Sequence, residues 1–123
     1  MKRKNLLLVE DEPVIALFEI IRLENDGYEV QYAKTGETAL EIVNKAKIDL
    51  ILMDIDLGRG MNGLETAGRI RQKYNMPILF LTSYEYCELK EQIENIENSA
   101  FLSDKSLPDE SIQCIKNFLS SKK

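Results

Sequence analysis

Acidic side chains stand directly after two apolar runs of the chain. The run 6–9 leads into Glu10 and Asp11, and the run 50–53 leads into Asp54. Unbroken apolar runs of this length are typical of parallel-sheet strands, which are buried on both faces. Right-handed crossovers place the carboxyl ends of such strands at one edge of the sheet, so these carboxylates can meet although they are distant in sequence. The sequence therefore predicts an acidic cluster at that edge.

The residue types indicate the chemistry of this cluster. Carboxylates held close together repel one another, which raises their pKa values unless a cation lies between them. The chain has no histidine, and the cluster offers only hard oxygen ligands. The expected cation is therefore Mg²⁺ or a near relative such as Mn²⁺. An aspartate neutralised by such a metal can attack phosphorus and hold an acyl phosphate, and Asp54 is the predicted nucleophile.

Two further polar residues follow later strands. Thr82 closes the run 78–81, and Lys105 lies just beyond the short run 100–103. A hydroxyl and an ammonium group at the same edge could bind the outer oxygens of a phosphoryl group on Asp54. Acids at two strand ends, a hydroxyl at the next and a lysine after the last are a much more specific signal than acids alone.

The elements that must position these residues are apolar strands alternating with helical patterns. The predicted strands are 6–9, 28–33, 50–54, 78–82 and 100–103. The first helix is expected to begin at Pro13 and stop at Gly27, and the second to be capped by Thr35. Apolar residues at helical spacing are Val14, Leu17, Phe18 and Ile21, then Ala39, Leu40 and Val43, then Leu64, Ala67, Ile70 and Tyr74, then Leu89, Ile93 and Ile96, and finally Ile112, Ile115 and Leu119. Five β–α units predict an α/β fold with helices on both faces of a parallel sheet.

The composition of the chain limits the class of protein and the kinds of partner it can have. The chain has 123 residues, 44% apolar and 30% charged, which is typical of one soluble globular domain spanning residues 1–123, with no output domain visible. A net charge of −5 without a basic face argues against direct nucleic-acid binding. No run approaches the roughly 20 apolar residues of a membrane span, and no signal peptide is present. Cys87 and Cys114 form no metal-type spacing, which favours free thiols in the cytoplasm.

Five segments together resemble the receiver domain of two-component response regulators, namely 7–12, 52–54, 61–63, 81–83 and Lys105. The resemblance covers nearly the whole chain. It implies a flavodoxin-like (βα)5 three-layer sandwich with strand order 2-1-3-4-5. It also implies that Asp54 accepts a phosphoryl group from a sensor histidine kinase or phosphotransfer protein. Such a domain is a signalling domain, which catalyses only its own phosphorylation and dephosphorylation.

The same resemblance assigns the remaining roles. Glu10, Asp11, Asp54 and the backbone carbonyl of Asp56 would hold Mg²⁺, while Thr82 and Lys105 would bind the phosphoryl oxygens. Phe101 would be the aromatic switch residue: the Thr82 hydroxyl moves toward the phosphoryl group, Phe101 fills the vacated space, and the surface of the fourth helix, fifth strand and fifth helix repacks. A downstream effector protein or domain would read that surface. A phosphorylation-dependent homodimer remains open.

Two departures from the family pattern leave alternatives. Phe101 stands four residues before Lys105, where the family usually has three, and Ser106 replaces the usual proline. Either a one-residue bulge restores the lysine, or Asp104 takes its place and its charge opposes phosphorylation. The second case predicts a degenerate receiver that binds a partner without phosphorylation.

Two other functions share some of these residue types. A phosphatase resembling the haloacid dehalogenase superfamily would also use Asp54, Asp56, Thr82 and Lys105. That group has its first motif near the start of the fold and a later acidic pair, whereas here an acidic strand end precedes Asp54 and no suitable pair follows. A flavin-binding protein of the same fold would need a hydroxyl- and glycine-rich loop where the acidic segment 10–12 stands.

Overall fold

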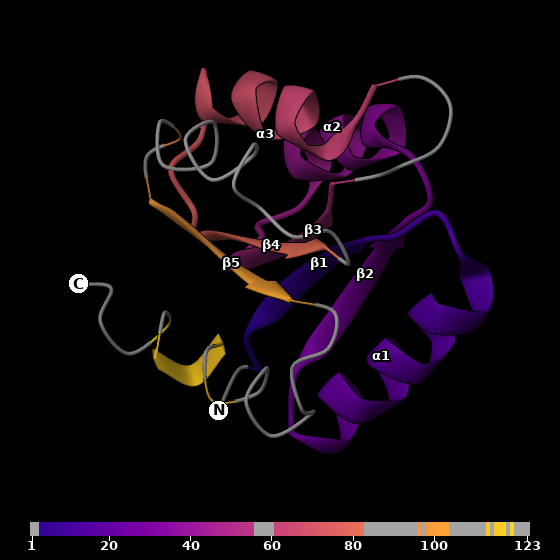
Figure 1. Cartoon of the computed structure of the whole chain (residues 1–123). Helices are drawn as coiled ribbons and strands as arrows, with labels where there is room; N and C mark the ends of the chain where they lie inside the picture. The colour runs from indigo at the N-terminus through magenta and orange to yellow at the C-terminus, as the bar shows by residue number, and fades with distance from the viewer. Residues whose placement is uncertain are drawn as a thin grey trace.

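Five parallel strands form one sheet in the order β2-β1-β3-β4-β5 (Figure 1). The computed structural model describes residues 3–55, 61–82, 96, 98–103, 113, 115–117 and 119. Within them the strands are β1 (Asn5–Val9), β2 (Glu29–Ala33), β3 (Leu50–Asp54), β4 (Ile78–Thr82) and β5 (Ser99–Ser103). The flavodoxin-like strand order is confirmed, and each strand begins and ends within one residue of the predicted run.

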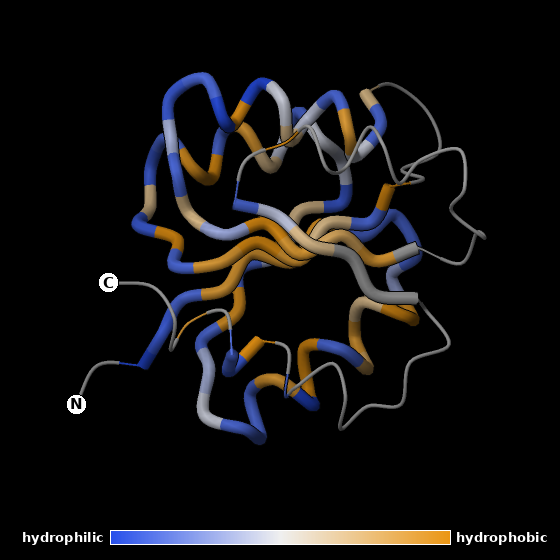
Figure 2. The backbone as a smooth tube through the Cα atoms, turned by 60° about the vertical axis from the view of Figure 1, so that its left-hand side comes forward, coloured by the Kyte–Doolittle hydropathy of each residue, from blue (hydrophilic) through white to orange (hydrophobic). Residues whose placement is uncertain are grey.

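The central strands are buried on both faces because alternate residues point to opposite sides of the sheet. One apolar layer contains Leu7, Val9, Ile51, Met53 and Phe80. The other contains Leu6, Leu8, Leu50, Leu52 and Leu79. None of these ten side chains is more than 2% exposed. In Figure 2 the strands accordingly form a hydrophobic band through the middle of the molecule. The acids that follow β1 and end β3 therefore stand at the rim of a low-dielectric core.

Helices cover both faces of the sheet, as predicted (Figure 1). Helices α2 (Gly36–Lys45) and α3 (Gly63–Arg71) lie on one face, and α1 (Pro13–Asn25) lies on the other. The Thr35 side chain accepts a hydrogen bond of 3.1 Å from the Thr38 N–H, which confirms the predicted cap of α2. Gly27 has a φ of 98°, the conformation expected of a glycine that follows a helix end.

The outward face of α1 is apolar. Its regularly spaced apolar residues are exposed, with Val14 66%, Ile15 50%, Leu17 55%, Phe18 67% and Ile21 46% exposed. Ala16 and Leu23 are buried instead and pack against the sheet. Helix α1 is apolar on more than one side, so periodicity alone could not tell which stripe faces the core. We call the five exposed side chains the α1 surface.

The C-terminal part of the chain is described only in places. Residues 113, 115–117 and 119 are helical, and Ile115 is 1% exposed within the same apolar layer as α1. This agrees with the predicted burial of Ile115 in a last helix. Leu89 and Ile93 of the predicted fourth helix lie outside the described residues, whereas Ile96, assigned to the same helix, is described and is not helical. In the part of the chain that is described, no helix has the length and apolarity needed to cross a membrane.

Candidate functional site

Glu10, Asp11 and Asp54 lie together at the carboxyl edge of the sheet. Strands β1 and β3 pair in parallel with Val9 opposite Met53, so the residues that follow in each strand become neighbours. One carboxylate oxygen from each of the three acids lies within 4.8 Å of the others. Glu10 is only 8% exposed, and Asp11 and Asp54 are half-buried. The structure thus forms the acidic cluster that the sequence predicts.

The environment of Glu10 favours its neutral form when no cation is present. Burial is the main cause that raises its pKa from 4.5 to about 8, and the neighbouring carboxyls of Asp54 and Asp11 raise it further. A hydrogen bond of 3.0 Å, donated by the Glu12 N–H to Glu10 Oε2, partly offsets this rise. Three converging carboxylates, one of them buried, form the hard-oxygen donor set that Mg²⁺ prefers. The residues therefore fit a divalent cation.

The end of β2 holds the acidic segment in place. The Glu10 N–H donates to the Ala33 carbonyl at 3.1 Å, and the Tyr32 hydroxyl donates to the Glu10 carbonyl at 2.7 Å. Burial, followed by the charges of Glu10 and Asp11, raises the pKa of Tyr32, so the hydroxyl remains a donor. Sequence reasoning missed this residue. Its only signal was a tyrosine near the end of the strand that pairs with β1.

Gly63 lets the start of α3 approach the end of β3. A Cβ atom on this residue would collide with the Asp54 carbonyl oxygen and would lie 2.8 Å from the Cα of Ile55. The Gly63 N–H donates to the Ile55 carbonyl at 2.8 Å, and the Asn62 side chain caps α3 by accepting from the Glu65 N–H at 2.8 Å. Only glycine fits this contact, because any Cβ would displace the backbone that carries Asp54.

The other predicted site residues are described in part or not at all. Asp54 pairs with Leu81, so Thr82 follows at the same edge as the acids, and Ser103 of β5 lies opposite Thr82. Phe101 of the edge strand β5 pairs with Phe80 of β4. For Thr82 and Phe101 only the backbone is described. Asp56, Asp104 and Lys105 lie outside the described residues, and so does the predicted bulge before Lys105.

Sequence comparison supports a single family. The profile of the response regulator receiver domain matches residues 6–116. The transcriptional regulatory protein YrkP of Bacillus subtilis (strain 168) is 44% identical over 78 residues, which are 63% of this chain and 33% of that protein. The match thus spans about a third of the length of this relative.

Solved structures agree with that match. The N-terminal domain of a response regulator/sensory box/GGDEF 3-domain protein from Carboxydothermus hydrogenoformans superposes with a TM-score of 0.87 at 34% identity, covering 95% of this chain and 94% of that one. The response regulator TrrA from Thermotoga maritima, a complex with Mg²⁺–BeF, superposes with a TM-score of 0.84 at 32% identity, covering 94% and 99% of the two chains. With its strand order and the profile match over residues 6–116, this chain belongs to the response regulator receiver domains of two-component systems.

Proposed function

We propose that Asp54 is the phosphoacceptor of a two-component pathway and takes its phosphoryl group from the phosphohistidine of a sensor histidine kinase or phosphotransfer protein. An Asp54 carboxylate oxygen forms the new bond to phosphorus while the phosphorus–nitrogen bond breaks, and the imidazole leaves with the electron pair. The observation that carries this proposal is the convergence of three carboxylates within 4.8 Å at the edge of the sheet. Such a cluster tolerates full ionisation only with a cation beside it.

Glu10, Asp11 and Asp54, with the backbone carbonyl of Asp56, are the proposed ligands of Mg²⁺ or Mn²⁺. When bound, the ion would neutralise the cluster and the charge of the incoming phosphoryl group. Burial of Glu10 at 8% exposure and the Tyr32 hydrogen bond to its carbonyl hold the acidic segment in place before the metal arrives. The Mg²⁺–BeF complex of TrrA, at 32% identity, supports the same ligand chemistry here.

Thr82 and Lys105 are proposed to bind the phosphoryl oxygens, and Phe101 to act with Thr82 as the switch. The strand register supports this, because Thr82 follows the Asp54–Leu81 pair and Ser103 lies opposite Thr82. The switch would change the surface of the fourth helix, fifth strand and fifth helix that a downstream effector protein or domain reads. A homodimer that forms on phosphorylation would use the same change.

The α1 surface is the proposed docking surface of the phosphodonor protein. Helix α1 begins at Pro13, directly after the acidic segment, so a partner that delivers a phosphoryl group to Asp54 must approach beside it. Val14 and Phe18, about two thirds exposed, lie on adjoining turns of the helix. A contiguous apolar surface on a soluble domain marks an interaction site. We therefore assign it to an apolar surface of the phosphodonor protein.

The deciding experiment is to incubate the protein with acetyl phosphate and Mg²⁺ and to measure its intact mass. A labile adduct about 80 Da heavier is expected in the wild type. It should be absent from Asp54→Asn and from samples treated with a chelator. Asp26→Asn is the matched control, since Asp26 is exposed in the turn after α1. If acetyl phosphate does not phosphorylate the wild type and beryllium fluoride does not bind to it, the phosphoacceptor proposal is wrong and a phosphorylation-independent binding module is favoured.

A further inference from the structure

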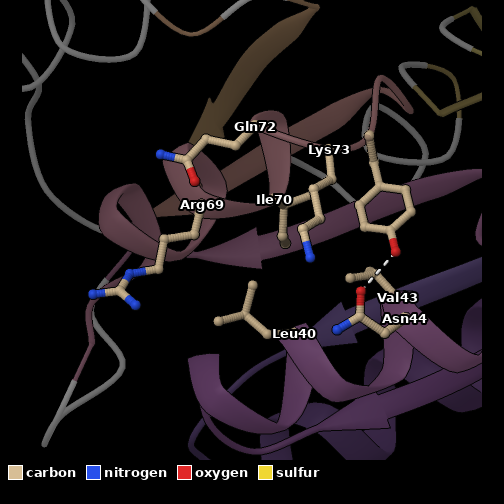
Figure 3. A pocket seen from close by; sticks show the side chains of 8 residues that line it. Leu40, Val43, Asn44, Arg69, Ile70, Gln72 and Lys73 are labelled. Carbon is tan, nitrogen blue, oxygen red and sulfur yellow. Dashed lines mark hydrogen bonds between the residues drawn. The ribbon is translucent and has the colours of Figure 1, made fainter.

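A groove runs between α2 and α3 (Figure 3). Its floor is apolar and its rim is cationic. Leu40 and Val43 of α2 and Ile70 of α3 form the floor, while Arg69 and Lys73 stand along the α3 side, one turn apart. This part has a volume of about 420 Å³. A second hollow of about 600 Å³ shares Leu40 and Arg69 with it but is also lined by the acidic side chains of Glu37 and Glu65. We call the first hollow, whose lining includes Leu40, Val43, Arg69, Ile70 and Lys73, the α2–α3 groove.

The two walls of the groove are held in place at both ends. Near the start of α2, Gly36 packs so closely on Thr66 that a Cβ atom would collide with the Thr66 hydroxyl. That hydroxyl donates to the Asn62 carbonyl at 2.8 Å, which fixes it within α3. At the other end, the Tyr74 hydroxyl donates to Asn44 Oδ1 at 2.6 Å (Figure 3). The groove is therefore preformed, and a ligand would not need to separate the helices.

Lys73 is placed to meet an anion above this floor. Figure 3 shows its side chain extending from the turn that follows α3 toward α2, between Ile70 and Tyr74. Among the described residues, no carboxylate lies within ion-pair distance of its ammonium group. Arg69 does have a partner, Glu65 at 3.7 Å, but both side chains are more than half exposed, so water already weakens that pair. Lys73 is exposed and lines the groove together with Val43 and Ile70, which are 4% and 1% exposed.

We propose that the α2–α3 groove binds a small amphiphilic carboxylate. Its apolar body would lie on partly exposed Leu40, above the nearly buried Val43 and Ile70, and its carboxylate would meet the Lys73 ammonium group, with Arg69 at the mouth. A neutral apolar molecule would gain nothing from the Lys73 ammonium group, and a cation would be repelled by it. The volume of about 420 Å³ lies within the usual range of small-molecule sites. None of the residues that line the groove belongs to the acidic cluster, so this proposal does not depend on the proposed phosphorylation.

The test is an NMR titration of the full chain with methyl-labelled Leu, Val and Ile, using hexanoate as the probe. Saturable shifts are expected at the methyl groups of Leu40, Val43 and Ile70, with a Kd on the order of 1 mM for so small a ligand. Hexylamine, of similar length and opposite charge, should not shift these signals. Lys73→Gln should weaken hexanoate binding at least about threefold, as expected for one exposed charge pair.

Lys47→Gln is the matched control, because Lys47 is an exposed lysine of the turn before β3 and does not line the groove. It should leave the Kd for hexanoate unchanged. Absence of saturable shifts at the three floor residues would overturn the proposal, and so would equal binding by wild type and Lys73→Gln. Equal binding of hexylamine would likewise show that no anion is recognised. Asp54 phosphorylation by acetyl phosphate should be the same in all variants, which separates this outcome from that of the proposed function.

Discussion

Binding of Mg²⁺ should be strongly coupled to pH through Glu10. In the metal-free protein, burial and neighbouring carboxyls raise the pKa of Glu10 to about 8. A carboxyl group must lose its proton to bind a metal, so the metal displaces one proton from Glu10 at neutral pH. The apparent affinity for Mg²⁺ should therefore rise with pH and level off above about pH 8.

The magnitude follows from the ionised fraction of Glu10. With a pKa of about 8, about half of the Glu10 side chains are ionised at pH 8, and about one in a hundred at pH 6. The apparent Kd for Mg²⁺ should then increase about 50-fold between pH 8 and pH 6. Isothermal titration calorimetry in buffers with different ionisation enthalpies measures both this change and the release of about one proton per ion.

Two variants test whether Glu10 is the source of the coupling. Glu10→Gln should bind Mg²⁺ weakly, with an affinity nearly independent of pH in this range. Glu12→Gln is the matched control: its side chain is exposed, and the hydrogen bond to Glu10 comes from its backbone N–H, which the substitution keeps. A wild-type affinity that does not change between pH 6 and pH 8, with no proton released, would refute the reasoning.

Four further predictions concern the same scaffold. In the presence of a chelator, Tm should fall as pH rises from about 5 to 8. The pKa of Glu10 is about 8 in the folded state and 4.5 in the unfolded state, so over this range the folded state holds a proton on Glu10 that the unfolded state has lost. Thermal melts of wild type and Glu10→Gln check this, and a flat wild-type profile would contradict it. Gly63→Ala should destabilise the fold by about 1–3 kcal/mol and impair Asp54 phosphorylation, because the new Cβ atom collides with the Asp54 carbonyl. Gly68→Ala lies on the same helix with open space around it, so it should stabilise the fold by about 0.5–1 kcal/mol. Denaturant unfolding compares the two variants, and equal effects would exclude the steric explanation. Tyr32→Phe removes the donor to the Glu10 carbonyl, so it should cost about 0.5–1.5 kcal/mol in urea unfolding and weaken Mg²⁺ binding; unchanged values of both would show that the hydroxyl positions nothing. Phe18→Ser should slow phosphotransfer about tenfold or more when the donor is a histidine kinase that phosphorylates the wild type, as expected for an interface anchor. Labelling by acetyl phosphate should stay the same. Glu24→Ser, exposed on the same helix, is the control, and equal loss with both phosphodonors would show that the α1 surface is not the docking surface.

Local pattern was enough to predict the strands and the acidic cluster. The apolar runs before Glu10 and Asp54 have the length and continuity of buried parallel strands, and the handedness of the crossovers then brings their ends to one edge. The Thr35 cap and the stop at Gly27 also depend only on backbone geometry within a few residues. Such features can be predicted because the interactions that determine them are short in sequence or common to all parallel sheets.

Features that depend on contacts between distant segments were decided by the tertiary structure. The rotation of α1, which buries Ala16 and exposes Phe18, follows from packing against the sheet, since the helix is apolar on more than one side. The need for glycine at position 63 comes from the close approach of the Asp54 backbone, and the role of Tyr32 comes from the pairing of β2 with β1. Sequence spacing carries no information on these distances, because they arise only when separate elements pack against one another.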